Sequence, residues 1–523
     1  MRPSTWQPPI ETSAVEDQII KRIKRARLFI FLRQHRHQIF TSEFQDELAG
    51  IFKDSLRGQP PVPPAMLALA LILQAYTGVS DDEVIEATLM DRRWQLALDC
   101  LDAQETPFSK GTFVAFRTRL IEHQMDRRLV ERTIEIAEAS KAFGPRNLRA
   151  ALDSSPLWGA GRVEDTYNLL GHALRKALGV IAREQGRALA AIAQEADAEL
   201  VAGSSLKATL DLDWGDSEAR GQALRQVLQT LERVEQWMSV NPELITKETV
   251  VPACLEAARQ VRTQDVTTNE AGEAVLIKGV AKDRRISIED AEMRHGRKSR
   301  SVRVDGYKRH VMRDLDSELV VAVGVTPANA PEAKVAEGIK KDLDQQQITL
   351  KELHIDRAYL SSILVSERSA ELEIFCKAWP VRAGAFFPKT AFNIDWEREM
   401  LRCPQGVEMS CQPGKVVHFP TEVCAACPQR SRCTGSKSGR SVKLHADEKL
   451  LQELRVRQGT SEGRATLRER VGVEHDLSHI GHWQGDRARY RGERKNLLDL
   501  RRCAVVNNLH IFARRPEIMA QAA

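Results

Sequence analysis

Two aspartates each end an apolar, strand-like run, and carboxylates in that position can bind a metal ion. Asp153 follows "NLRAAL" and Asp356 follows "LKELHI". An aspartate at such a boundary is also a favoured helix N-cap, so each residue alone is explained without any chemistry. If the two strands were neighbours in one sheet, the carboxylates would repel each other unless a cation lay between them. The pair therefore indicates a cation site, with helix capping as the simpler alternative.

A third acid would complete such a site, because two carboxylates bind Mg²⁺ weakly and two-metal phosphoryl chemistry generally needs another. The helix-like segment "TLRERVGVEHDLSHIGHW" offers Glu474, which follows Arg470 by four positions. That spacing places both side chains on one helix face, where an ordinary ion pair is the plainer explanation. Glu469 and Asp476 compete with Glu474 for the role.

Cysteines form a second group of possible metal ligands. Five of the nine lie between positions 403 and 433, with the spacing Cys-x7-Cys, then Cys-x2-Cys-x5-Cys. Such clustering favours metal over disulfides in a cytoplasmic chain, and a Cys-x2-Cys pair holds one side of a tetrahedral zinc. Reduced structural cysteines are the alternative, and Cys411 or His418 could substitute for Cys403. The set best suited to a structural Zn²⁺ is Cys403, Cys424, Cys427 and Cys433.

The elements that must position these residues begin with a helical N-terminal region. Ile19 to Gln34 is basic and amphipathic, and "PPVPP" precedes a buried helix over Ala65 to Tyr76. The turn "TGVS" then leads into Ser80-x-x-Glu83, a capping box that opens another helix. A helix, a short glycine-bearing turn and a second helix are compatible with a DNA-binding helix-turn-helix, or with a plain bundle.

From Asn147 the pattern becomes mixed. A strand ending on Asp153 precedes a helical stretch, and a β-hairpin (Tyr307 to Arg313 and Leu319 to Thr326) follows it. A helix over Pro331 to Gln345 and the strand ending on Asp356 come next. Without the helical stretch the order is β-β-β-α-β, the opening of a ribonuclease-H-like fold. Strands one and four are neighbours in such a sheet, which would bring the two aspartates together.

These patterns predict an α/β ribonuclease-H-like core, a mixed sheet flanked by helices, with an all-α N-terminal domain and two insertions. A chain of 523 residues is too long for one ordinary core. The expected division is a helical DNA-binding domain at 1–140, the first core strand at 141–170, a helical insertion at 171–275, more core at 276–370, a Cys-rich insertion at 371–445 and C-terminal core helices at 446–523.

The composition excludes a membrane protein and favours an anionic partner. The N-terminus lacks the apolar core of a signal peptide, and no apolar run approaches membrane-spanning length, so we expect a cytoplasmic protein. The net charge is only +5, but basic residues concentrate in Arg294 to Arg303 and Arg487 to Lys495. Such stretches suit phosphate contact, although a solvated charged face is the commoner explanation.

Several motifs in the same order resemble the DDE transposases of bacterial insertion sequences. They are "ALDSSPLWGAGRVEDT", "DGYKRHV", "HIDRAYLSS" and "RVGVEHDLSHI…ARYRGERKNLLDLRRCAVVNNL", with "LQAYTGVSDDEVIEATLMDRRWQLALDCL" near the N-terminus. The resemblance implies a catalytic triad of Asp153, Asp356 and Glu474 that holds two Mg²⁺ or Mn²⁺ ions. It also implies that water nicks the element end and that the liberated 3′-OH then attacks target DNA.

The resemblance further implies double-stranded DNA as the partner, both element ends and target, with a homodimer or higher assembly on DNA in the bacterial nucleoid. Two positions depart from the family's signature Tyr-x2-Arg-x3-Glu-x6-Lys: Leu467 stands for Tyr and Gly481 for Lys. His482, Arg487 or Arg489 could replace the lysine. The expected phosphate contacts are Lys308, Arg357, Arg470, Arg487, Arg489 and Arg491.

Two other functions use the same features. A catalytically inactive, transposase-derived repressor would bind DNA without cutting it. The intact Asp153, Asp356 and Glu474 argue against this alternative, and the two signature departures keep it open. A stand-alone nuclease of the same fold would cut without joining, but it would not need so large an N-terminal region.

Overall fold

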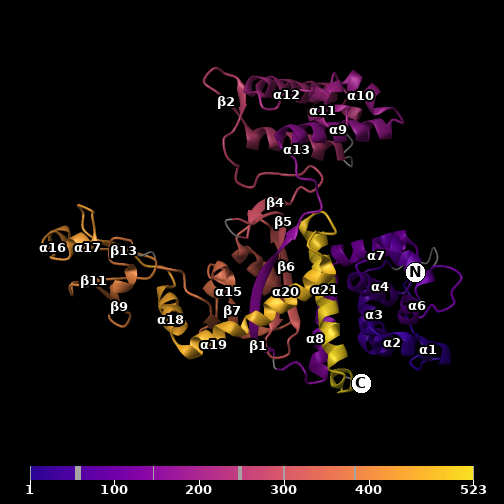
Figure 1. Cartoon of the computed structure of the whole chain (residues 1–523). Coiled ribbons are helices and arrows are strands. Elements are labelled where there is room, and N and C mark those ends of the chain that lie inside the picture. Colours follow the sequence, from indigo (N-terminus) through magenta and orange to yellow (C-terminus); the bar gives the residue numbers. More distant parts are fainter. Residues whose placement is uncertain are drawn as a thin grey trace.

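The computed structural model describes residues 2–53, 60–144, 146–244, 250–298, 301–381 and 384–521. The basic stretch Arg294–Arg303 is therefore described except at positions 299 and 300, which lie outside these ranges. Within these ranges no helix is both long and apolar enough to cross a membrane. Figure 1 shows a central sheet with helices beside it, a separate helical bundle, and a small β-rich extension.

The central sheet is mixed and has six strands in the described part of the chain, in the order β4-β5-β1-β7-β8, with β6 also paired to β5. β1 runs antiparallel to β5 and parallel to β7, and β5 and β6 form the predicted hairpin. The strands are β1 (Asn147–Trp158), β4 (Arg294–Arg297), β5 (Arg303–Asp314), β6 (Val320–Pro327), β7 (Thr349–Ile355) and β8 (Glu373–Phe375).

Helices flank this sheet, as expected for an α/β core. The predicted helix after the hairpin is present as α14, and the C-terminal segment folds into helices that pack on β1, β5 and β6. They are η3 (Glu332–Val335), α14 (Ala336–Gln345), η4 (Arg357–Tyr359), α15 (Ile363–Ser366), α18 (Glu448–Gly459), α19 (Ser461–Glu469), α20 (Val471–Gln484), α21 (Glu493–Arg514) and α22 (Glu517–Gln521).

The N-terminal region is helical and shares one apolar core with the sheet and α21. The amphipathic segment Ile19 to Gln34 is divided between two helices rather than forming one. The capping box of Ser80 and Glu83 is present at the start of α5. The helices are α1 (Ala14–Arg22), α2 (Arg27–Ile39), α3 (Ser42–Ala49), α4 (Pro64–Thr77), α5 (Asp81–Met90), α6 (Arg92–Leu98), α7 (Lys110–Glu122) and α8 (Asp126–Ala139).

A helical bundle with its own apolar core is inserted after β1 and lies at the top of Figure 1. Its longest helices carry apolar side chains at helical spacing on one face, and these faces meet. Its elements are α9 (Thr166–Glu184), α10 (Leu189–Glu195), η1 (Glu199–Val201), α11 (Leu206–Leu210), α12 (Ser217–Val240), η2 (Pro242–Leu244), α13 (Val250–Asp265), β2 (Val266–Thr268) and β3 (Ala274–Leu276).

The cysteine-rich segment forms the small extension at the left of Figure 1. Short strands and helices surround a core in which only seven buried apolar residues are found within the described ranges. The short strands and helices are η5 (Lys389–Ala391), β9 (Asn393–Asp395), β10 (Met400–Arg402), β11 (Glu408–Ser410), β12 (Val416–His418), α16 (Thr421–Ala425), α17 (Arg430–Cys433) and β13 (Ser441–Lys443).

Candidate active site

Asp153, Asp356 and Glu474 line one cavity of about 1070 Å³. Leu152 of β1 pairs with Ile355 of β7 in parallel register, so the two aspartates are the next residues on adjacent strands. Glu474 comes from α20, which packs against β1. The structure therefore brings together three acids from distant parts of the sequence.

Local backbone geometry holds both aspartates. One carboxylate oxygen of Asp153 accepts a hydrogen bond from the Ser154 N–H at 2.8 Å. The Asp356 carboxylate accepts one from the Arg357 N–H at 2.7 Å and caps the short helix η4. Asp356 is thus a cap and a cavity residue at once, because a single N–H bond leaves most of its acceptor capacity unused.

The competing acids are placed differently from Glu474. Glu469 pairs with Arg149 outside the cavity. Asp476 is buried and receives a 3.0 Å ion pair from Arg313 on β5. Both have partners that hold the fold, whereas Glu474 is half exposed at the cavity. Of the three candidates, only Glu474 faces the two aspartates.

Arg470 lies between two of the acids. Its guanidinium contacts Asp153 and also donates to Glu474 at 3.0 Å. Burial raises the pKa of the Asp153 carboxyl; the Arg470 charge opposes this rise, and the charges of Glu474 and Asp356 add to it. Two carboxylates in contact with one arginine, and a third in the same cavity, form a site whose electrostatics demand positive charge.

Oxygen donors of this kind suit Mg²⁺ or Mn²⁺. In the conformation described for residues 2–521 outside the stated gaps, no three His, Cys, Asp or Glu side chains are arranged closely enough to hold an ion. At the acids the reason is Arg470, whose guanidinium occupies the space between Asp153 and Glu474. The donor types fit divalent cations, and their convergence on one ion requires Arg470 to move.

A buried polar network supports the loop that carries Asp356. His310 of β5 contacts the Tyr359 hydroxyl at 2.7 Å through one ring nitrogen and Thr326 at 2.9 Å through the other. Burial, with a smaller contribution from the Lys308 charge, lowers the pKa of His310 to about 3, so the ring is neutral. Apart from the polar residues within a β-type run, no sequence pattern indicates this network.

The basic residues expected to contact phosphate fall into two groups. Lys308 lines a smaller adjoining cavity with Asp153 and Asp356, and its ammonium donates to the Ala330 carbonyl at 2.9 Å. Arg470 lines the main cavity, and Arg357 follows Asp356 directly. The other three bind protein groups: Arg487 donates to the Gly159 carbonyl, Arg489 to the carbonyls of Gly78 and Val79, and Arg491 pairs with Glu289 at 2.8 Å.

Two basic residues of the cavity lining were not among the candidates expected from sequence. Lys298 lines both cavities, and Arg309, next to Lys308 on β5, lines the larger one. Both lie in basic motifs, but only the fold shows which side chains of those motifs turn towards the acids. His482, a proposed substitute for the missing lysine, also lines the cavity.

Four cysteines gather at one end of the Cys-rich segment. Cys403, Cys424, Cys427 and Cys433 line a cavity of about 280 Å³, and all four are free thiols. Burial raises the pKa of Cys433, and the other three thiols add to the rise while Arg440 opposes it. Cys411 is buried in the small core beside them. The thiols share one cavity, but they are not drawn together into metal-binding geometry in the described structure.

Two family models match the chain. Residues 402–512 match the family described as Transposase DDE domain, and residues 17–119 match the family described as Transposase domain (DUF772). Both are transposase families, so they confirm the resemblance to a DDE transposase of an insertion sequence and support a transposase function. The first match includes Glu474, and the second covers most of the N-terminal helices. No curated protein and no solved structure matches.

Proposed function

We propose that this transposase cuts the ends of its own insertion sequence and joins them to target DNA by phosphoryl transfer in the cavity lined by Asp153, Asp356 and Glu474. One observation carries the proposal: three acids from distant segments, Asp153 within β1, Asp356 directly after the parallel strand β7 and Glu474 on α20, line one cavity, and an arginine contacts two of them. The strand order β6-β5-β1-β7-β8 supports a ribonuclease-H-like core.

The three carboxylates would hold two Mg²⁺ or Mn²⁺ ions. When bound, these ions would supply Lewis acidity for the attacking and leaving oxygens of a phosphodiester. The chain's own contribution is positional. The β1–β7 register fixes two acids relative to the sheet, and α20 presents the third. Arg470 neutralises the acids in the absence of other cations and, once released from them, is placed to contact a DNA phosphate.

The N-terminal helices, 1–140 in the expected division, would bind the element ends. Arg489 supports this arrangement, because its guanidinium ties the turn between α4 and α5 to the segment that follows α20. End-binding helices would thereby be held in a fixed position relative to the cavity. Pairing of two element ends would require at least a dimer on DNA.

The direct test is strand transfer with Mg²⁺ or Mn²⁺ on a duplex carrying the element end. Asp356→Asn should bind this duplex as the wild type does and lose joining by roughly a thousandfold or more, since it removes a metal-binding charge worth several kcal/mol. Glu474→Gln should behave in the same way. Glu469→Gln is the matched control, because Glu469 lies outside the cavity, and it should retain joining.

Each other result identifies a different function. A wild-type protein that nicks without joining would be a nuclease, and one that binds without nicking would be a repressor. If Asp356→Asn still joins strands, the assignment of the three acids is wrong.

We also propose that Cys403, Cys424, Cys427 and Cys433 bind one structural Zn²⁺. Their shared cavity supports this, as does the small core of the segment, which is too limited to hold it rigidly. The purified protein should contain one zinc per chain. Cys427→Ser should lose the zinc and make residues 384–445 sensitive to protease, whereas Cys254→Ser, in the helical bundle, should retain it. A wild-type protein without zinc would contradict the proposal.

A further inference from the structure

Arg309 is a buried cation without a carboxylate partner among the residues that the structure describes. Its side chain is on β5 and the residue is 4% exposed. The guanidinium donates to the Ser155 hydroxyl at 2.7 Å, to the Gln484 side-chain oxygen at 3.1 Å and to the Gly485 carbonyl at 3.0 Å. All three acceptors are neutral, so nothing in contact with Arg309 cancels its charge.

The other fully buried arginines of the described chain are all paired. Each contacts an acid: Arg33 pairs with Glu16, Arg36 with Asp99, Arg501 with Asp126 and Asp342, and Arg502 with Asp499. Such pairing is the rule because an isolated buried charge costs several kcal/mol. Arg309 departs from this rule, and it is the one of the five that lines the cavity with the three acids.

One guanidinium nitrogen of Arg309 remains available. Nη2 makes no hydrogen bond within the described ranges, whereas Nε and Nη1 are used. It lies beside Gly481, where a Cβ would come within 3.1 Å of it. The absence of a side chain at Gly481 therefore leaves room for the guanidinium at the cavity wall.

The residues that orient Arg309 lie on the elements that carry two of the acids. Ser155, which fixes Nε, follows Asp153 by two residues on β1, and Gln484 ends α20, the helix that carries Glu474. The same two elements that present acids to the cavity thus orient the arginine. A planar guanidinium with a free edge suits the oxygens of a phosphodiester.

We infer that Arg309, oriented by Ser155 and Gln484, is a phosphate-binding residue that holds a DNA phosphodiester beside the acids and receives from it the direct anionic contact that no described side chain provides. This inference rests on the proposed function for its ligand, although the buried, unpaired charge stands independently of it.

The experiment compares Arg309→Met and Arg309→Lys with the wild type in two assays. The first measures the rise in Tm that inorganic phosphate produces, which reports anion binding to the folded protein. The second measures how the affinity for an element-end duplex falls with salt. Arg309→Met should lose the phosphate-dependent rise, bind the duplex about ten- to a hundredfold less tightly, and have a salt slope smaller by about one. Arg309→Lys should keep most of each effect.

Arg502→Met is the matched control, because Arg502 is equally buried but paired with Asp499. Its Tm should fall sharply because Asp499 loses its partner, while the phosphate-dependent rise persists. Arg309→Met should instead keep or raise the Tm without phosphate, since it removes an uncompensated charge. A purely structural arginine would give the opposite pattern: a lowered Tm with phosphate binding intact.

The outcomes separate this inference from the proposed function. A wild-type protein that binds no duplex, but whose phosphate-dependent rise is lost in Arg309→Met, would sink the proposed function and support the anion subsite. A wild type that binds the duplex, with Arg309→Met unchanged in affinity, salt slope and phosphate response, would overturn the inference alone. If Arg309→Met does not fold, Gly481→Ala decides, because its Cβ would lie 3.1 Å from Nη2: a diminished response supports the subsite, and an undiminished one overturns it.

Discussion

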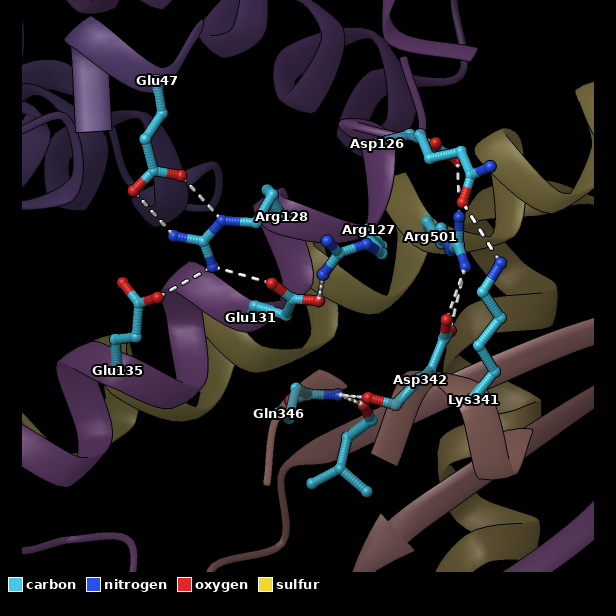
Figure 2. Close-up of polar contacts among 12 residues, drawn as sticks. Glu47, Asp126, Arg127, Arg128, Glu131, Glu135, Lys341, Asp342, Gln346 and Arg501 are labelled. Atoms are coloured by element: carbon cyan, nitrogen blue, oxygen red, sulfur yellow. Dashed lines mark hydrogen bonds and ion pairs between the residues drawn. The ribbon is translucent and has the colours of Figure 1, made fainter. Parts of the chain in front are cut away.

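Two groups of charged residues in the same core are organised in opposite ways. In the cavity, Asp153 and Glu474 share one arginine, and a second arginine, Arg309, contacts no acid among the residues that the structure describes. In the interface between α8, α14 and α21, positive and negative groups alternate and pair (Figure 2). The first arrangement leaves charges for a ligand to satisfy, and the second leaves few.

The paired group joins three parts of the chain. Asp126, at the start of α8, accepts hydrogen bonds from Arg494 at 2.8 Å and Arg501 at 3.0 Å, both on α21. Arg501 also donates to Asp342 of α14 at 2.9 and 3.1 Å (Figure 2). Asp126 is almost fully buried. The network thus fixes the N-terminal helices to the core through complementary charges.

The difference between the two groups shows that the role of a buried charge in this molecule depends on whether it has a partner. Where each ion has its partner, the charge positions structural elements and its removal should destabilise the fold. Where charges of one sign accumulate, or an ion lacks its partner, the fold bears a cost that a bound ligand can remove. Stability and ligand binding should therefore respond in opposite directions in the two groups.

The largest stability effect is expected in the paired group. Asp126→Asn leaves two arginines without their shared carboxylate and should lower the free energy of unfolding by about 3–5 kcal/mol in urea titrations. The control is Asp46→Asn, since Asp46 forms an exposed pair with Arg2 and should change stability by less than about 0.5 kcal/mol. Equal stability of the two variants would show that the paired buried charges do not stabilise the fold more than an exposed pair does.

A smaller effect on stability is expected from His310. Its ring is buried in the neutral form, behind the cavity. Its folded pKa of about 3 lies below the unfolded value, so the unfolded chain binds the proton more readily. Stability is therefore lost as pH falls below about 6.5. Lowering the pH from 6.5 to 5 should cost the wild type about 1.5 kcal/mol more than His310→Gln. The same loss in both proteins would show that His310 is not the group responsible.

The smallest effect concerns Arg470. Its removal should free Asp153 and Glu474 for divalent cations, so Arg470→Gln should bind Mn²⁺ about three- to tenfold more tightly in calorimetric titrations without DNA. Arg368→Gln breaks a pair with Asp447 away from the cavity and should leave Mn²⁺ affinity unchanged. Weaker binding by Arg470→Gln would mean that the arginine supports the site rather than competing for it.

Local patterns predicted much of the core from sequence. The hairpin, the helix after it and the strand that leads to Asp356 depend on apolar alternation and short-range turns, and all are present. The strand expected to end on Asp153 is present too, but it continues to Trp158, because its pairing with β5 extends to that residue. The capping role of Asp356 could be predicted from sequence, because the N–H group that donates to its carboxylate belongs to the next residue. The basic, amphipathic segment Ile19 to Gln34 is helical on both sides of a break that its pattern does not reveal, because α1 ends at Arg22 and α2 begins at Arg27.

The candidate site was less predictable where partners are distant in sequence. Glu474 and Asp476 look equivalent in sequence, because they lie two positions apart on one helix. Only the fold shows that Asp476 forms an ion pair with Arg313 of β5. Arg489 looked like a DNA contact because its partners, the carbonyls of Gly78 and Val79, lie more than 400 positions away. The role inferred for Arg309 could not be predicted from sequence, because it depends on the lack of a carboxylate partner. No local motif indicates that lack.

The position of α21 has a consequence for how the chain is made. This helix, synthesised long after α4 and α8, packs against both, and its Asn508 donates to Thr133 at 2.8 Å. Domains generally fold as their segments emerge during synthesis. Here the N-terminal helices lack a wall of their core until α21 has been synthesised. A prematurely terminated chain would therefore expose the apolar face of α4 and be a substrate for proteolysis, rather than a stable fragment able to occupy DNA ends.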